Sequence, residues 1–143
     1  SLPSRGLGDV YKRQEQYRLT KQIKFIDHCK DMALAYQVSD IIISPSIEPE
    51  AFGRVAVEAQ SMEKLIIASN IGGSNETIVN EKTGFLFESG DVNSLSKKII
   101  RAITMDETSL RLIGKEGRKN VIKKFNVEKM CFSTYSEYKR LLN

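Results

Sequence analysis

Two short apolar runs without polar alternation constrain the fold of this chain most. Ile41–Ile43 (III) and Leu65–Ala68 (LIIA) are rich in β-branched residues and contain no polar residue. A strand with one face in water alternates apolar and polar residues, whereas a strand covered on both faces does not. Because segments with helical spacing separate and follow these runs, the pattern predicts a Rossmann-like, doubly wound parallel α/β sheet with extra C-terminal helices.

The remaining elements are predicted from apolar spacing and turn residues. Two more strands are predicted at Ile23–Ile26 and Gly84–Phe87. Helices are predicted for residues 31–38, 52–62 and 75–80, and for three amphipathic segments that begin near residues 92, 110 and 127. Asp91 or Asn93 is expected to cap the first amphipathic segment and Asn126 the last. On the last segment, Tyr135 and Tyr138 lie in an apolar stripe and are expected to pack in the core.

Composition excludes several classes of protein. The 143 residues are the size of one domain, and 41% hydrophobic with 28% charged residues exclude a disordered chain. No apolar run reaches the ~20 residues of a membrane-spanning helix, and the first fifteen residues contain no signal peptide. Cys29 and Cys131 have no metal-like spacing, so reduced thiols and a cytoplasmic location are expected.

Charge is spread unevenly along the chain. Residues 97–143 hold 12 basic and 5 acidic residues, whereas residues 16–96 hold 7 basic and 11 acidic ones. A lysine-rich, solvated helix surface is the favoured interpretation, and peripheral contact with the inner face of a membrane remains open. Nucleic-acid binding is not expected, because no nucleic-acid motif is present and the middle of the chain is acidic.

The first fourteen residues, SLPSRGLGDVYKRQ, are expected to be non-native or disordered. They show no clear periodicity, and Asp9–Gln14 looks like the translation of a transposon end used to prepare DNA for sequencing. In that case the native chain begins near Glu15 and the gene was longer upstream. An ordinary flexible tail is the alternative.

Two loops follow the predicted strands and lead into helix starts, namely Ser44–Phe52 and Asn70–Ser74. Ligands of open α/β sheets bind at the carboxyl ends of the strands, and the N–H groups at a helix start suit a phosphate. Gly53, Gly72 and Gly73 are expected to let a ligand approach the backbone closely.

Two carboxylates bracket the site predicted at the first loop. Glu50 lies just before the predicted helix, and Glu58 follows after seven intervening residues. A carboxylate accepts hydrogen bonds from two adjacent hydroxyls, as on a ribose or pyranose edge. Two interpretations remain on these residues alone: a nucleotide-sugar site, or glutamates that cap the helix and favour its dipole.

The stretch Pro45–Met62 (PSIEPEAFGRVAVEAQSM) resembles the retaining "group 1" glycosyltransferases of GT-B architecture, which are glycosyltransferase family 4-like. Their hallmark of two glutamates around E-x-F-G corresponds here to EAFGRVAVE. Later motifs match in the same order, namely GGSNE (Gly72–Glu76), TGFL (Thr83–Leu86) and the Asp91–Leu95 helix start. The resemblance covers roughly residues 23–142.

The resemblance implies one half of an enzyme with two Rossmann-like domains. Residues 15–126 would be the donor-binding domain, truncated at its start, and residues 127–143 a helix that packs back toward an absent N-terminal acceptor domain. The implied reaction transfers a sugar from a UDP-, GDP- or ADP-sugar to an acceptor glycan or lipid-linked glycan, with retention and without a metal or other cofactor. Cell-envelope polysaccharide or lipopolysaccharide synthesis is the implied setting, and the fragment alone is expected to be inactive. A non-catalytic nucleotide-binding module is the alternative.

The resemblance also implies roles for individual residues. Glu50 would contact the donor sugar as the catalytic residue, and Glu58 would hold the ribose hydroxyls. The backbone N–H groups of Phe52, Gly53 and Arg54 would face the sugar diphosphate. Ser46 and the segment Phe25–His28 would line the base pocket. The turn Gly72–Gly73 would also belong to the binding site.

Three departures from the family pattern carry consequences. Asp27 stands where the family usually has glycine, which puts base recognition in doubt. Glu63-Lys64-Leu65 replaces a usual Gly-x-Pro, which should cost stability rather than activity. The strand that normally supplies an Arg and a Lys to the diphosphate is absent.

Overall fold

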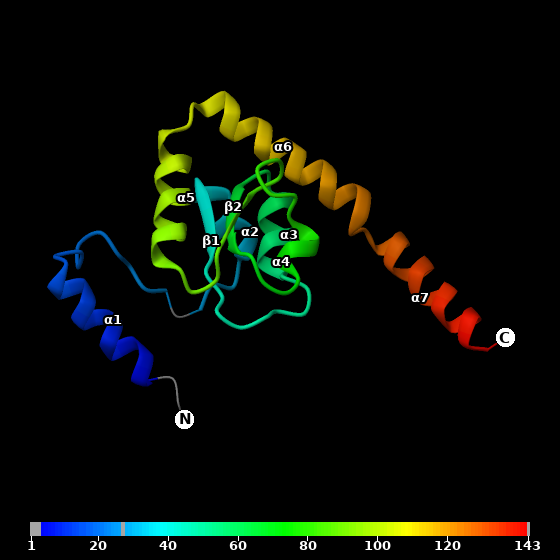
Figure 1. The fold of residues 1–143 in the computed structure, drawn as a ribbon, viewed down its shortest axis with the longest axis horizontal. Helices are drawn as coiled ribbons and strands as arrows, with labels where there is room; N and C mark the ends of the chain where they lie inside the picture. The colour runs from blue at the N-terminus through cyan, green and yellow to red at the C-terminus, as the bar shows by residue number, and fades with distance from the viewer. Residues whose placement is uncertain (1–3, 27, 143) are drawn as a thin grey trace. The chain divides into compact units, whose positions relative to one another are not determined.

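The computed structural model describes residues 4–26 and 28–142, and the chain divides into two units, residues 1–31 and 32–143. In the first unit, Ser4–Gln16 form helix α1 (Figure 1), and the rings of Tyr11 and Phe25 meet edge to face with centroids 5.0 Å apart. Whether residues 1–14 are native stays a prediction.

The predicted strand Ile23–Ile26 is wrong, because this segment pairs with no strand among the described residues and the Ile26 side chain is 78% exposed. A parallel strand requires a neighbouring strand as its hydrogen-bonding partner.

The second unit is built on a parallel sheet. Strands β1 (Ile41–Ser44), β2 (Leu65–Ser69) and β3 (Phe85–Phe87) lie in the order β1-β2-β3. Ile41 is opposite Leu65, and Ile67 is opposite Phe85. The central strand β2 is buried along its whole length, as its unbroken apolar run predicts.

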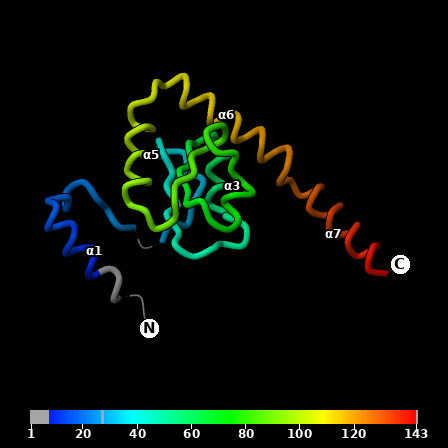
Figure 2. The backbone as a smooth tube through the Cα atoms, viewed as in Figure 1, coloured from blue at the N-terminus to red at the C-terminus, as the bar shows by residue number. Residues whose placement is uncertain are grey.

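Helices cover both faces of this sheet. The helices of the second unit are α2 (Met32–Val38), α3 (Arg54–Ser61), α4 (Ser74–Thr77), α5 (Val92–Thr104), α6 (Glu107–Lys124) and α7 (Val127–Leu141), and all but α7 pack near the sheet. On β2, Ile66 and Ala68 pack in a core cluster with residues of α2 and α3, whereas Leu65 and Ile67 pack on the other face with α5 and α6. Figure 2 shows α3 and α5 on opposite sides of the strands. The predicted doubly wound α/β architecture is therefore confirmed.

The predicted helix caps are confirmed. The Asp91 carboxylate accepts hydrogen bonds from the backbone N–H groups of Asn93 and Ser94, so Asp91 rather than Asn93 is the cap of α5. The Asn126 side chain accepts one from the N–H of Lys129 at the start of α7. Each bond satisfies a donor that the first helical turn leaves without a partner.

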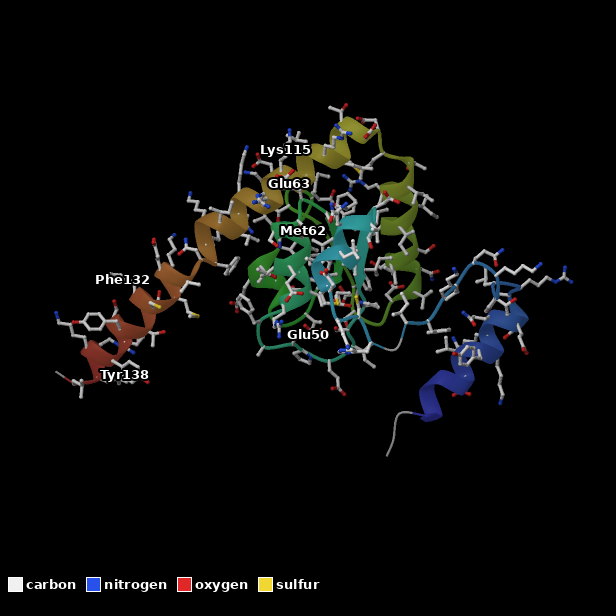
Figure 3. The ribbon with its side chains drawn as sticks, turned by 180° about the vertical axis from the view of Figure 1, so that it is seen from behind. Glu50, Met62, Glu63, Lys115, Phe132 and Tyr138 are labelled. Carbon is white, nitrogen blue, oxygen red and sulfur yellow. The ribbon has the colours of Figure 1, made fainter. Side chains whose placement is uncertain are left out.

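Helix α7 contributes no buried residue among those described. Tyr135 and Tyr138 are each 65% exposed, so their predicted packing in the core is wrong. Figure 3 shows Phe132 and Tyr138 on a helix that does not cover the sheet. Apolar periodicity predicts which face of a helix is apolar, but it does not specify what covers that face.

Helix α3 ends in a Schellman motif that has glutamate at the position usually held by glycine. The N–H of Lys64 donates to the carbonyl of Ala59, and the N–H of Glu63 donates to the carbonyl of Gln60, both at 3.0 Å. Glu63 accordingly adopts a left-handed conformation with φ of 57°. An L side chain is strained in that conformation, whereas glycine is not.

Substituting Glu63→Gly is expected to raise the free energy of unfolding by about 1 kcal/mol, because it removes this backbone strain. The side chain contributes little, since Arg118 Nε lies 3.8 Å from Glu63 Oε1 and both groups are about half exposed. Denaturant unfolding of the wild type and of Glu63→Gly and Glu63→Ala measures the effect. Alanine keeps the Cβ atom, so an equal gain in both variants would assign the effect to the carboxylate instead.

Candidate functional site

The two glycines of the turn after β2 pack against the loop that carries Glu50. The N–H of Gly73 donates to the carbonyl of Glu50 at 2.7 Å. A Cβ atom on Gly72 would lie 2.6 Å from the Glu50 carbonyl oxygen, and one on Gly73 would lie 2.4 Å from the carbonyl carbon of Phe52. These contacts pack the two predicted loops against each other, and the role of the two glycines in ligand binding stays a prediction.

Helix α3 begins at Arg54, two residues later than predicted. Gly53 takes a left-handed conformation, with φ of 72°, and this conformation cannot continue the helix toward Phe52. No side chain caps this helix in the described part of the chain. The N–H groups of Arg54 and Val55, in its first turn, therefore have no intrahelical acceptor and present the positive end of the helix dipole beside the Glu50 loop, whereas the N–H of Ala56 donates to the carbonyl of Gly53.

Glu50 lies at the end of the sheet to which the strands point. Its Oε1 accepts a hydrogen bond from Ser46 Oγ at 2.6 Å, and the carbonyl of Ser46 accepts one from Ser89 Oγ at 3.1 Å. The second carboxylate oxygen of Glu50 has no hydrogen bond or ion pair to the residues that the structure describes. Figure 3 shows Glu50 at one end of α3, with Met62 and Glu63 at the other.

Glu58 lies on the second turn of α3 and has two partners in the second unit. Its Oε2 accepts a hydrogen bond from the Tyr36 hydroxyl at 2.8 Å, and its Oε1 accepts one from Arg54 Nη2 at 3.0 Å. Tyr36 is 4% exposed, whereas the Arg54 side chain is 83% exposed. Burial, followed by the hydrogen bond to Glu58, raises the pKa of Tyr36 to about 12. The phenol is consequently a hydrogen-bond donor throughout the neutral range.

Sequence reasoning missed Tyr36 as a site residue. The helix predicted over residues 31–38 carried no prediction about this side chain. The phenolic hydroxyl was the available signal, because a buried tyrosine usually finds a hydrogen-bond partner. The identity of that partner, 22 residues later in the chain, requires the fold.

Phe52 takes part in a contact between the site and the junction of α6 and α7. Its ring is 47% exposed and meets the ring of Phe125 edge to face, with centroids 5.7 Å apart. Both rings line a hollow of about 740 Å³ together with most of the residues between Lys124 and Ser133, and neither Glu50 nor Glu58 lines it. The hollow therefore adjoins the carboxylate site without containing it.

Three further predictions concern the base segment, metal ligands and membrane-spanning helices. The segment Phe25–His28 belongs to the first unit, and Asp27 lies outside the described residues, so its role at the base stays a prediction. No three histidine, cysteine, aspartate or glutamate side chains gather as metal ligands within residues 4–26 and 28–142. Over the same residues, no helix combines the length and the apolar character needed to span a bilayer.

The sequence has curated relatives. The family model "Glycosyl transferases group 1" matches residues 8–120. The capsular polysaccharide biosynthesis glycosyltransferase CapM of Staphylococcus aureus is 34% identical over 120 residues, which are 84% of this chain and 31% of the relative. The UDP-Gal:alpha-D-GlcNAc-diphosphoundecaprenol alpha-1,3-galactosyltransferase of Escherichia coli is 30% identical over 119 residues, which are 83% of this chain and 30% of the relative. The chain thus spans about a third of the length of these relatives.

Solved structures share the fold. A glycosyltransferase from Rickettsia africae ESF-5 superposes with a TM-score of 0.88 at 37% identity, over 96% of this chain and 36% of that one. Anabaena Alr3699/HepE in complex with UDP-glucose superposes with a TM-score of 0.86 at 22% identity, over 96% of this chain and 38% of that one. The second likeness concerns the fold alone.

Proposed function

Because this chain belongs to the group 1 glycosyl transferases and has the Rossmann-like half of their GT-B fold, we propose that it binds the nucleotide-sugar donor of a retaining glycosyltransferase. The observation that carries the proposal is the arrangement around α3. An uncapped helix start lies between Glu50, in the loop before it, and Glu58, on its second turn. A diphosphate fits the helix start, and hydroxyl groups on either side of it fit the two carboxylates.

Each predicted residue has a role in this proposal. Glu50, whose second oxygen is unengaged by described residues, accepts hydrogen bonds from the sugar as the catalytic residue. Glu58 accepts hydrogen bonds from the ribose diol. The backbone N–H groups of Phe52, Gly53 and Arg54 stabilise the diphosphate as negative charge builds on the leaving group.

The remaining residues support these groups. Ser46 orients Glu50 through its 2.6 Å hydrogen bond and borders the base. Gly72 and Gly73 hold the Glu50 loop in place through backbone packing. Helix dipole and N–H groups supply the charge complementarity, so the proposed reaction needs no metal ion.

The proposed setting is cell-envelope glycan synthesis. One relative is named for capsular polysaccharide biosynthesis and another for a diphosphoundecaprenol-linked substrate. A glycan or lipid-linked glycan acceptor, peripheral membrane contact through the basic segment 97–143, and a hexosyl donor with UDP, GDP or ADP follow as proposals. Sugar transfer is proposed for a protein that also has an acceptor domain. For this chain alone, the proposal is donor binding without transfer.

The test is titration of the chain with UDP-, GDP- and ADP-glucose by calorimetry, comparing the wild type with Glu58→Gln. One of the three donors is expected to bind. The amide has no charge and one acceptor atom fewer toward the diol, so Glu58→Gln is expected to weaken that affinity about 10- to 100-fold.

Glu107→Gln is the matched control. Glu107, like Glu58, pairs with an arginine one helical turn away, here Arg111 on α6, and both of these side chains are exposed. This control is expected to bind the donor as the wild type does. Equal affinity of wild type and Glu58→Gln would contradict the assignment of Glu58, and failure of all three donors to bind would contradict the proposed function.

A further inference from the structure

The Glu58 carboxylate is held by one buried and one exposed partner. We propose that Tyr36 is a positioning residue of the donor site, whose hydroxyl holds the Glu58 carboxylate in the orientation that binds the ribose diol. The inference rests on the proposed function, because it concerns the same carboxylate.

The packing of Tyr36 immobilises its hydroxyl. Its ring belongs to the core cluster that includes Ala56 and Ala59 of α3 and Ile66 of β2. Only its polar end reaches the site, where the hydroxyl donates to Glu58 Oε2 at 2.8 Å. Since α2 and α3 share this core, the Tyr36 hydroxyl is fixed relative to α3, the helix that carries the Glu58 carboxylate.

The other partner of Glu58 cannot provide the same restraint. Arg54 lies one turn earlier on α3 and reaches Oε1 at 3.0 Å, but its side chain is 83% exposed. An exposed ion pair between adjacent helical turns contributes little and competes with water. The rigid orientation of the carboxylate therefore depends on Tyr36.

The hydrogen bond leaves the carboxylate able to bind a diol. Each carboxylate oxygen has two acceptor sites, so Oε2 can accept from Tyr36 and from one ribose hydroxyl together. Oε1 accepts from the neighbouring hydroxyl, beside or in place of Arg54. Because burial and Glu58 keep the Tyr36 pKa far above neutrality, the phenol keeps its proton and continues to donate.

The test is Tyr36→Phe, which keeps the buried ring and removes the hydroxyl. Affinities for UDP, GDP and ADP, and for the 2′,3′-dideoxy form of each, are measured by calorimetry on the full chain. For the nucleotide that binds, we expect Tyr36→Phe to weaken binding about five- to twentyfold, which is less than the loss expected for Glu58→Gln, because the carboxylate remains but loses its fixed orientation. The dideoxy form has no diol, so its affinity is expected to be the same in wild type and variant.

The dideoxy comparison separates positioning from a general structural effect. A variant that only loosens the fold weakens both forms equally, and that result, or an unchanged ribonucleotide affinity, overturns the inference. Tyr138→Phe, on the exposed face of α7, is the control and is expected to leave both affinities unchanged.

Two further measurements keep the outcome interpretable. In a Glu58→Gln background, Tyr36→Phe is expected to have no additional effect, because the hydroxyl acts through the carboxylate. Ultraviolet titration of Glu58→Gln is expected to lower the pKa of one tyrosine below about 12, because the hydrogen bond and the charge of Glu58 are lost while burial, the larger cause, remains; no change would show that the contact is absent. If wild type binds no nucleotide, the proposed function fails and the inference with it, whereas binding with equal loss for both sugar forms contradicts the inference alone.

Discussion

Replacing Gly73 by alanine is expected to lower the free energy of unfolding by about 3 kcal/mol, the upper end of the overpacking range, and to displace the Glu50 loop. The backbone of Gly73 has φ of −60° and ψ of −19°, which alanine adopts without strain. Space is the reason for glycine, because the added Cβ would lie 2.4–2.7 Å from three backbone atoms of Phe52. Backbone atoms cannot rotate away, so the loop must move and the 2.7 Å hydrogen bond from Gly73 to Glu50 must lengthen.

Denaturant unfolding gives the stability of Gly73→Ala, and calorimetric donor titration reports the displacement of the loop. Gly90→Ala is the control, because Gly90 has φ of 77° but no atom within 4 Å of an added Cβ. Gly90→Ala therefore measures the cost of the backbone conformation alone, expected to be about 1 kcal/mol, whereas Gly73→Ala measures the steric cost. A Gly73→Ala protein no less stable than Gly90→Ala would contradict the steric explanation.

A second large loss of stability is expected for Gly114→Ala in helix α6. A Cβ atom at this position would lie 2.1 Å from the carbonyl oxygen of Glu63, at the turn that ends α3. Helix propensity alone predicts that alanine stabilises α6 by about 1 kcal/mol. The overlap with backbone outweighs this gain, and we expect a net loss of about 2–3 kcal/mol as α6 shifts away from the turn.

Gly117→Ala provides the control within the same helix. Its added Cβ would meet Gln60 Cγ at 3.0 Å and the carbonyl oxygen of Thr83 at 3.3 Å, which small adjustments can relieve. The propensity gain is the same for both substitutions, so the difference between their unfolding midpoints measures the contact with Glu63. We expect Gly117→Ala to lie within about 1 kcal/mol of wild type; equal stabilities for the two variants would contradict the explanation.

Much of the second unit could be predicted because its signals are local. The apolar run of β2 predicts its burial on both faces correctly, whereas β1, at the edge of the described sheet, is only partly buried and Ile43 is exposed, so that prediction is wrong for β1. Asp91 and Asn126 mark helix starts through bonds to residues two and three positions away. The order of glutamates and glycines along the chain is enough to indicate the group 1 family.

Features that depend on distant partners were predicted poorly. Ile23–Ile26 has the composition of a strand, but a strand exists only when another strand pairs with it. The stripe on α7 is regular, and yet Tyr135 and Tyr138 are exposed, since periodicity does not name a covering surface. The start of α3 was predicted two residues too early, because the left-handed conformation of Gly53 ends the helix there. A glycine in a sequence permits that conformation without requiring it.

Only part of the candidate site could be predicted, because some of its contacts join distant parts of the chain. Its carboxylates belong to a motif only nine residues long, so sequence indicates Glu50 and Glu58 directly. Their partners come from other elements. The bond from Tyr36 to Glu58 and the packing of Gly73 on Phe52 depend on how α2, α3 and the glycine turn meet.

The close contacts at both ends of α3 have a consequence for engineering. Gly73 abuts the chain just before the helix, and Gly114 abuts the turn just after it, so the helix is held by residues that have no side chain. Substitutions that probe the proposed donor site therefore have latitude at exposed positions of the loop, such as Ile47 and Glu48, whose replacement leaves these contacts intact. Libraries that randomise the two glycines would mostly sample misfolded proteins rather than new specificities.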